Sequence, residues 1–382
     1  MQAVETPHKK LDYKLIQKKN LIGLSEKELY ESILELRIPE KKASMRTKQL
    51  WSWIYCHGKK DFSEMSNLDK VFRSDLKDNF SLERLKIEKK EKSLDGTIKY
   101  LFSLNDNSKI ETVFIPEKKR STLCISSQVG CTLNCSFCHT GTQNLVRNLT
   151  AEEIVGQLIA VYDDLGQWEK SKQINDGLSN YQIITNIVFM GMGEPLLNYS
   201  EVKKSIIILM NDKGLDFSRR RITLSTAGVV PLIKKAHDEL GCMIAISLHA
   251  TEDKTRNILV PLNKKWPIDT LIKTLKDDLK LRNSERITFE YVMLKDVNDT
   301  ELDAKRLVKK IRGLPSKINL IPFNKWNGSG YERSTQKKIQ AFSEIIKKAG
   351  FPSPVRAPRG EDIMAACGQL KSTTLKKRLN NA

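Results

Sequence analysis

Short apolar runs alternate with helical patterns along the second half of the chain. Next to the runs, apolar residues recur at the spacing of one helix face, as Ile154, Leu158, Val161 and Leu165 do. Such alternation is typical of a parallel sheet covered by helices, so the pattern predicts an α/β fold. The expected strands are residues 121–126, 187–190, 222–224, 243–248, 287–293 and 318–321, which make six strand–helix units.

The chain before residue 121 follows other periods. Residues 84–92, 97–104 and 109–115 favour strands, and Asp95-Gly96 is typical of a hairpin turn. Farther upstream the spacing is helical, and a polar stretch over 167–183 is expected to be a surface loop. The predicted organisation is a disordered basic extension (1–20), a helical accessory domain (21–82), a β extension (83–120), the strand–helix region (121–350) and a C-terminal segment with a basic tail (351–382).

The chain is strongly basic, with 65 Lys and Arg against 46 Asp and Glu and a formal net charge of +19. This charge points to a nucleic acid as partner. Because no run of about 18 apolar residues occurs, we expect a cytoplasmic protein with no membrane partner. The helical domain suits RNA contacts or a small core equally well, and the pattern leaves both open. The residues concerned are Lys41, Lys48, Trp51, Trp53 and Tyr55.

Three cysteines, Cys131, Cys135 and Cys138, lie within a stretch of eight residues. Zinc sites normally draw on two separated pairs, whereas three thiolates suit a cubane iron–sulfur cluster with one iron left free for a small molecule. A zinc site completed by His139 is the alternative. The spacing resembles the Cys-x3-Cys-x2-Cys pattern of the radical S-adenosylmethionine (SAM) enzymes. This resemblance implies a partial (β/α)6 barrel and one [4Fe-4S] cluster.

Polar residues follow several predicted strands, at the edge where parallel barrels collect their chemistry. Gly193 and Glu194 follow the second strand, and a carboxylate there can pair with the amine of SAM. The stretch resembles the Gly-Gly-Glu-type motif of radical SAM enzymes. Hydroxyl, imidazole and amide groups suit the rest of the SAM molecule. The candidates for these contacts are Ser225, Ser247, Leu248, His249 and Asn324.

Two further cysteines extend the resemblance to one family. Cys124 precedes the three-cysteine motif, and Cys367 lies in Ala-Ala-Cys-Gly-Gln-Leu near the C-terminus. With Gly-Met-Gly-Glu-Pro, Ser-Leu-His and Asn-Leu-Ile-Pro-Phe-Asn, they resemble the RlmN/Cfr family, and within it the group that methylates carbon 2 of adenine in RNA. The resemblance implies that Cys367 carries a methyl group, that Glu111 accepts a proton, and that Cys124 frees the product by forming a disulfide with Cys367.

The same resemblance implies the cofactors and partners. One [4Fe-4S] cluster acts with two SAM molecules in each turnover, one as methyl donor and one as radical source. The substrates are adenosines in 23S-type ribosomal RNA and in tRNA, the electron donor is a flavodoxin or ferredoxin, and the protein is a monomer. Two alternatives stay open: a Cfr-type enzyme acting on carbon 8 of adenine, and a zinc-stabilised RNA-binding protein without catalysis.

Overall fold

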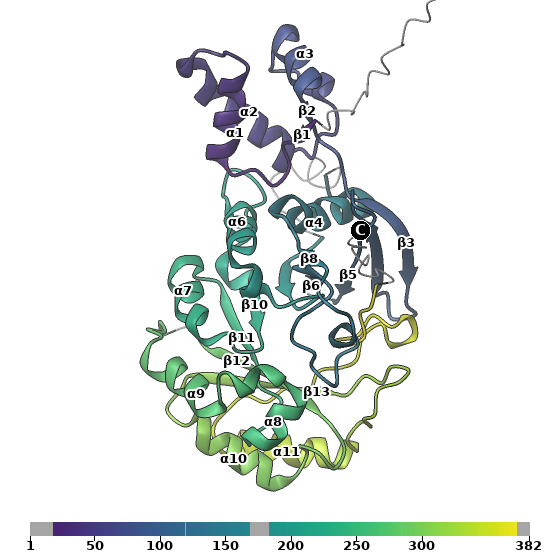
Figure 1. Ribbon diagram of the computed structural model, residues 1–382, viewed down its shortest axis with the longest axis vertical. Helices are drawn as coiled ribbons and strands as arrows, with labels where there is room; N and C mark the ends of the chain where they lie inside the picture. The colour runs from purple at the N-terminus through teal and green to yellow at the C-terminus, as the bar shows by residue number, and fades with distance from the viewer. Residues whose placement is uncertain (1–17, 119, 169–182, 284, 373–382) are drawn as a thin grey trace, which may run out of the picture.

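A computed structural model describes residues 18–118, 120–168, 183–283 and 285–372 and confirms the α/β fold. Six strands pair in parallel along one side of a nine-stranded sheet that does not close into a ring. The six units expected from the apolar runs are therefore present as a partial barrel (Figure 1). In spatial order the strands are β6 (Ser121–Cys124), β9 (Asn186–Phe189), β10 (Ile222–Thr226), β11 (Met243–Ser247), β12 (Ile287–Met293) and β13 (Ser316–Pro322).

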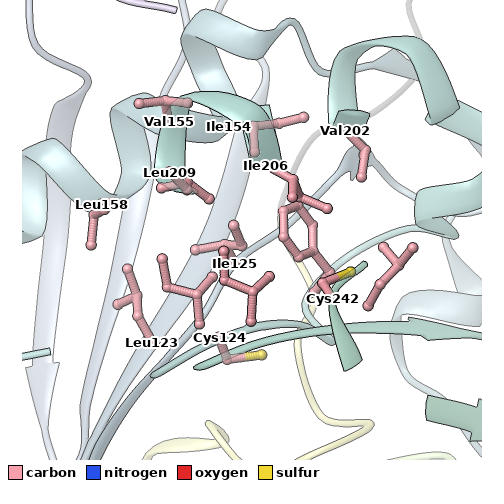
Figure 2. Close-up of a cluster of buried hydrophobic side chains, with 14 of the residues drawn as sticks. Leu123, Cys124, Ile125, Ile154, Val155, Leu158, Val202, Ile206, Leu209 and Cys242 are labelled. Carbon is pink, nitrogen blue, oxygen red and sulfur yellow. The ribbon is translucent and has the colours of Figure 1, made fainter. Parts of the chain in front are cut away.

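Helices cover the outer face of these strands. Helix α4 begins at a capping box, where the Thr150 hydroxyl accepts from the Glu153 N–H, and ends at Gly166 in the left-handed conformation. Figure 2 shows apolar side chains of α4 and α6 gathered over β6, with the sulfur of Cys124 on the opposite side of that strand. The helices are α4 (Ala151–Leu165), α6 (Tyr199–Met210), α7 (Val230–Leu240), α8 (Asp253–Leu259), α9 (Ile268–Asp277), α10 (Glu301–Ile311) and α11 (Gln336–Lys348).

Three antiparallel strands continue the sheet beyond β6. Strand β5 (Lys109–Pro116) pairs with β6, and β4 (Ile98–Ser103) and β3 (Lys86–Lys92) follow in order. Each lies within two residues of a strand expected from the period-two pattern. The β extension therefore shares one sheet with the barrel, and its residues lie beside the first parallel strand.

A small helical unit precedes this extension. Helices α1 (Glu26–Glu35), α2 (Glu40–Tyr55) and α3 (Lys70–Asn79) lie above the sheet in Figure 1. Trp51 and Tyr55 are buried in the core, so only Trp53 remains as an accessible aromatic side chain among the three considered for RNA stacking. The two-residue strand β1 (Lys19–Asn20) pairs with β2 (Phe80–Ser81). Residues 19 and 20 were expected to belong to a disordered extension, and the structure instead shows them in a strand.

Residues 1–17, most of the loop expected over 167–183, and the basic tail after residue 372 lie outside the described residues. The C-terminal segment that precedes this tail packs along the barrel, where the Leu320 N–H donates to the Pro354 carbonyl. It then forms the short 3-10 helix η6 (Glu361–Ile363) and reaches the region near β6. Among the described helices, none has the length and apolar character needed to cross a bilayer.

Candidate active site

The three-cysteine motif occupies a loop that is closed at its base. Strands β7 (Gln128–Val129) and β8 (Arg147–Asn148) pair on either side of it, and the Cys131 N–H donates to the Gln143 carbonyl at 3.3 Å. Inside the loop, Asn134 has a φ of 50°, which turns the chain between the first two cysteines. The short spacing of the motif therefore produces a compact turn rather than a strand or a long helix.

The three thiols of this loop have properties that suit cluster ligands. Burial raises the pKa of Cys131 to about 12, and it raises that of Cys135 further, with the neighbouring thiols adding to the effect. Backbone N–H groups approach the sulfurs, as at Leu133, which lies 3.5 Å from the Cys131 Sγ. Desolvated thiols that receive N–H donors suit a positively charged iron–sulfur core, which would displace their protons, and Arg256 adds a positive charge near Cys135.

The structure does not by itself identify the ligands. Among the described residues, no group of three or more His, Cys, Asp and Glu side chains is drawn together as if around a metal ion. The assignment of Cys131, Cys135 and Cys138 as cluster ligands therefore stays a prediction, supported by their shared loop and their chemistry.

Glu194 lies at the end of β9 in the position expected of an amine-binding carboxylate. It is 2% exposed, and its two oxygens accept from the Ala227 N–H at 2.8 Å and the Leu196 N–H at 3.1 Å. Burial raises its pKa to about 7, and no ion pair to it occurs among the described residues. A buried carboxylate without an internal cation suits a cationic ligand such as the amine of SAM.

The glycines beside Glu194 serve the packing of the loop. A Cβ on Gly191 would lie 2.7 Å from the Ile125 carbonyl oxygen, and one on Gly193, whose φ is +101°, would lie 2.5 Å from the Gln128 Cβ. The absence of side chains at these two positions therefore allows residues 125–128 to approach closely. This close approach joins the end of β9 to the start of the cysteine loop.

A buried arginine ties together the neighbouring strand ends. Arg256 of α8 is 1% exposed, and its guanidinium donates to the carbonyls of Ala227, Ser247 and Leu248 at 2.6, 3.0 and 2.9 Å. It also donates to the Asn263 side chain at 2.8 Å. Arg256 therefore holds the ends of β10 and β11 together. Both strands carry candidate SAM contacts, namely Ser225 on β10 and Ser247, Leu248 and His249 at the end of β11.

His249 is held as a neutral imidazole. It has a φ of 60°, and its Nδ1 accepts from the Val292 N–H at 3.1 Å, so Nε2 carries the proton. Burial and the positive charge of Arg256 lower its pKa to about 3. The ring meets Phe137 of the cysteine loop edge to face at 4.7 Å. His249 therefore presents an N–H donor next to the cysteine loop.

Glu111, Cys124 and Cys367 come from three segments that meet at β6. In the pairing of β5 with β6, Val113 lies opposite Cys124, so Glu111 is two residues away along the neighbouring strand. Both Cys124 and Cys367 are free thiols, and the nearness of Cys367 adds to the effect of burial in raising the pKa of Cys124. Cys367 as a residue is exposed, whereas desolvation by the surrounding protein raises the pKa of its thiol.

The segment that carries Cys367 is docked on the cysteine loop. The His139 N–H donates to the Gly368 carbonyl at 2.7 Å, and the Thr140 hydroxyl donates to the Leu370 carbonyl at 2.6 Å. Asn324, a candidate SAM contact, instead donates to the Cys367 carbonyl at 3.2 Å. The structure thus places the segment around Cys367, the candidate methyl carrier, beside the three-cysteine loop.

Sequence reasoning missed three residues of this region. Arg256 lies on a short helix without a motif, and Gln157 faces inward from α4 to bond both backbone groups of Ser126 at 2.8 and 2.9 Å. Lys99 lies beside Glu111, with its Nζ 3.6 Å from the Glu111 Oε1. None carries a local signal, because each acts through partners that are distant in sequence.

Comparison with known proteins places the chain in a family. Residues 125–308 match the Radical SAM superfamily, and residues 19–82 match the ribosomal RNA large subunit methyltransferase N-terminal domain. The chain is 54% identical over 360 residues to the dual-specificity RNA methyltransferase RlmN of Paracoccus denitrificans, covering 94% of this chain and 91% of the relative. The chain belongs to the RlmN family.

A second relative and a solved structure agree with this family assignment. The RlmN protein of Cereibacter sphaeroides is 55% identical over 363 residues, which cover 95% of this chain and 92% of that protein. A crystal structure of a radical SAM methyltransferase from Sphaerobacter thermophilus aligns with a TM-score of 0.82 and 38% identity, covering 92% of this chain and 98% of that one. RlmN-family enzymes are SAM-dependent RNA methyltransferases. These matches give no support to the carbon-8 or zinc-binding alternatives.

Membership of the RlmN family and the Radical SAM superfamily implies a [4Fe-4S] cluster and SAM. The described residues fit both groups. The thiols of the cysteine loop are desolvated and close to one another, and Glu194 forms no ion pair with any described residue. Cys131, Cys135 and Cys138 would hold the cluster, and Glu194 would hold the SAM amine.

Proposed function

We propose that this protein methylates carbon 2 of an adenosine in large-subunit ribosomal RNA and in tRNA, with Cys367 as the residue that carries the methyl group. The docking of the Cys367 segment on the cysteine loop is the observation that best supports this proposal. The bond from the His139 N–H to the Gly368 carbonyl, at 2.7 Å, joins the residue after the third cysteine to the residue after Cys367. A sulfur at position 367 is thus next to the loop that would hold the cluster.

Carbon 2 of adenine is electron-poor, and its C–H bond is too weak an acid for ordinary methyl transfer. The reaction therefore needs a carbon radical. When bound, the reduced [4Fe-4S] cluster and SAM supply a 5′-deoxyadenosyl radical that takes a hydrogen atom from the methyl group on Cys367. Before that, the Cys367 sulfur loses its proton and takes the methyl group of a first SAM molecule, with S-adenosylhomocysteine as the leaving group. The Cys367-bound methylene carbon then forms the bond to carbon 2.

Two residues of the chain resolve the covalent adduct between the protein and the RNA. Glu111 accepts the proton of carbon 2, and Cys124 attacks the Cys367 sulfur. The radical adduct also loses one electron, for which the oxidised cluster would be the acceptor when bound. The bond between the methylene carbon and the Cys367 sulfur then breaks, the carbon keeps the electron pair and takes up a proton to become the methyl group, and a Cys124–Cys367 disulfide forms that must be reduced before the next turnover. The free thiols of Cys124 and Cys367, close enough for their charges to interact, suit this exchange.

The helical domain is the proposed contact for the RNA backbone. A surface hollow of about 480 Å³ lies on α2, and its lining includes two lysines and no acidic residue. This is the composition expected of a phosphate-binding surface. The lining residues are Lys41, Ser44, Met45, Lys48, Gln49, Ser52 and Asn67. We also propose a cytoplasmic monomer that is reduced by a flavodoxin or ferredoxin and uses two SAM molecules per turnover.

The proposed function is tested by the fate of Cys367. We expect the purified protein to carry a methyl group on Cys367, and Cys124→Ala to accumulate a covalent RNA–protein adduct that is visible on a denaturing gel. Cys56→Ala, which changes an exposed thiol on the helical domain, serves as the matched control and should accumulate none. Full turnover by Cys367→Ala would exclude the mechanism.

The position of methylation is tested separately. RNA from a deletion strain and from its complemented counterpart would be digested to nucleosides and compared by mass spectrometry with 2-methyladenosine and 8-methyladenosine standards. We expect 2-methyladenosine to disappear from both ribosomal RNA and tRNA in the deletion strain. Loss of 8-methyladenosine instead would contradict the assignment to carbon 2.

A further inference from the structure

A row of charged side chains crosses the antiparallel extension. Lys99 of β4 lies directly opposite Glu91 of β3, and its Nζ is 3.2 Å from the Glu91 Oε2. On the other side, Leu101 lies opposite Glu111, so Lys99 is diagonal to Glu111 on the same face of the sheet. The Lys99 Nζ lies 3.6 Å from the Glu111 Oε1. One buried ammonium group is therefore shared between two carboxylates.

The same two side chains hold the segment that carries Cys367. The Lys99 ammonium donates to the Ile363 carbonyl at 2.6 Å, and the Glu111 Oε2 accepts from the Lys371 N–H at 2.7 Å. Ile363 lies four residues before Cys367, and Lys371 lies four residues after it. Figure 1 shows this C-terminal segment running beside the antiparallel strands. Lys99 and Glu111 thus fix both ends of the Cys367 segment.

Lys99 and burial have opposite effects on the pKa of Glu111. Glu111 is 6% exposed, and desolvation raises its pKa, while Lys99 and the Lys371 N–H act to lower it. Among the described residues, Glu91 of β3 also faces Glu111 and acts to raise its pKa. Burial outweighs the other causes, so the pKa of Glu111 is raised overall, and Lys99 supplies the positive charge that favours its ionised form. A proton acceptor must be ionised before it can act.

We propose that Lys99 is a positioning residue of this site, which holds the Glu111 carboxylate charged and directed at the Cys367 segment so that it can accept the carbon-2 proton. This inference rests on the proposed function, in which Glu111 takes that proton. The charge of Lys99 is needed only after the carbon–carbon bond has formed. Methyl loading of Cys367 and formation of 5′-deoxyadenosine do not depend on it.

The test is a single turnover of the cluster-loaded protein with methylated Cys367 and an RNA substrate, followed over a range of pH. The amounts of 5′-deoxyadenosine, covalent RNA–protein adduct and free methylated RNA are measured. Lys99→Gln keeps a donor for the Ile363 carbonyl but removes the charge. We expect it to form 5′-deoxyadenosine normally, to resolve the adduct about 10-fold more slowly at neutral pH, and to resolve it best at higher pH than the parent protein.

Two further variants separate charge from shape. Lys99→Arg keeps the charge, so it should resolve the adduct with nearly the parental pH profile. Lys89→Met is the matched control, because Lys89 bonds Glu91 at 2.8 Å from an exposed position and is not a partner of Glu111. It should behave as the parent does. Should Lys99→Gln fold poorly, a parental profile in Lys99→Arg still supports the proposal, and a displaced profile overturns it.

Glu111→Gln distinguishes failure of this inference from failure of the proposed function. If Glu111→Gln accumulates the adduct while Lys99→Gln resolves it at the parental rate and pH, only the role of Lys99 is wrong. If Glu111→Gln itself resolves the adduct at the parental rate, the proposed role of Glu111 is wrong, and the role of Lys99 is excluded with it. Loss of methyl loading at Cys367 in Lys99→Gln would show that Lys99 only anchors the segment, which also overturns the proposal.

Discussion

Gly141 offers a direct test of whether the cysteine loop holds a cluster. It lies three residues after Cys138, outside the three-cysteine motif, and its φ is not in the left-handed range. A Cβ at this position would lie 2.5 Å from the carbonyl oxygen of Cys135 and 2.9 Å from its backbone nitrogen. Space alone therefore demands glycine here, and the atoms that a larger residue would displace belong to a predicted ligand.

These distances give an estimate of how much Gly141→Ala should weaken cluster binding. An ordinary contact at 3.4 Å requires the Cys135 backbone to move by about 0.9 Å from its position 2.5 Å away. Metal–ligand distances vary by only about 0.2 Å, so such a movement misplaces the Cys135 sulfur. Overpacking of this kind costs about 1–3 kcal/mol. If that cost falls on the cluster-bound state, Gly141→Ala should bind the cluster about 5- to 150-fold more weakly.

The assay is anaerobic reconstitution followed by challenge with an iron chelator. Iron and sulfide per chain are measured over time, and far-ultraviolet circular dichroism monitors the fold. Gly330→Ala is the matched control, because a Cβ there meets nothing within 4 Å and its φ is also outside the left-handed range. We expect Gly141→Ala to lose iron faster than both the parent and this control. A parental iron content and chelator resistance in Gly141→Ala would refute the reasoning.

Two further predictions concern the strand ends. Arg256→Met removes four buried hydrogen bonds and should lower the free energy of unfolding by about 3–5 kcal/mol in urea titrations, whereas the exposed Arg282→Met should leave it unchanged. Glu194, with its pKa raised from 4.5 to about 7, holds a proton in the folded cofactor-free protein that the unfolded chain releases. Its contribution to stability is therefore present below about pH 4.5 and is lost as the pH rises through 7. The stability of the parent relative to Glu194→Gln should fall by on the order of 3 kcal/mol between pH 4.5 and 8, and parallel pH curves for the two proteins would contradict this.

Local patterns predicted the elements well, because their causes are local. The run over 287–293 is strand β12 residue for residue, and the helical stripe from Ile154 to Leu165 lies within α4. Each of these signals depends on backbone geometry within a few residues. The aromatic residues of α2 were ambiguous for the opposite reason, since only packing against other segments decides that Trp51 is buried while Trp53 is not.

The residues of the candidate site also fall into those that local sequence signals reveal and those that only the fold reveals. Cys131, Cys135 and Cys138 were found from spacing, and Glu194 from its place after a strand. Arg256 could not be found, because its role is defined by carbonyl groups at the ends of two strands, and backbone carbonyls leave no trace in a sequence. Composition treats Arg256 as one of 65 basic residues. Its burial alone distinguishes it, and burial is a property of the folded chain.

In the proposed mechanism, the residues for radical formation and those for product release lie on different parts of the fold. The parallel strand ends and the cysteine loop carry the residues suited to the cluster and SAM, while Glu111 lies on β5 and Cys367 on the C-terminal segment, both outside the six parallel strands. An open barrel has an edge at β6, and β5 covers it by antiparallel pairing. This pairing sets Glu111 close to Cys124, whose side chain comes from the barrel itself. The antiparallel strands and the C-terminal segment thus add specific residues to a scaffold suited to radical formation. We therefore expect substitutions on β4 and β5 to affect adduct resolution and to leave radical formation intact.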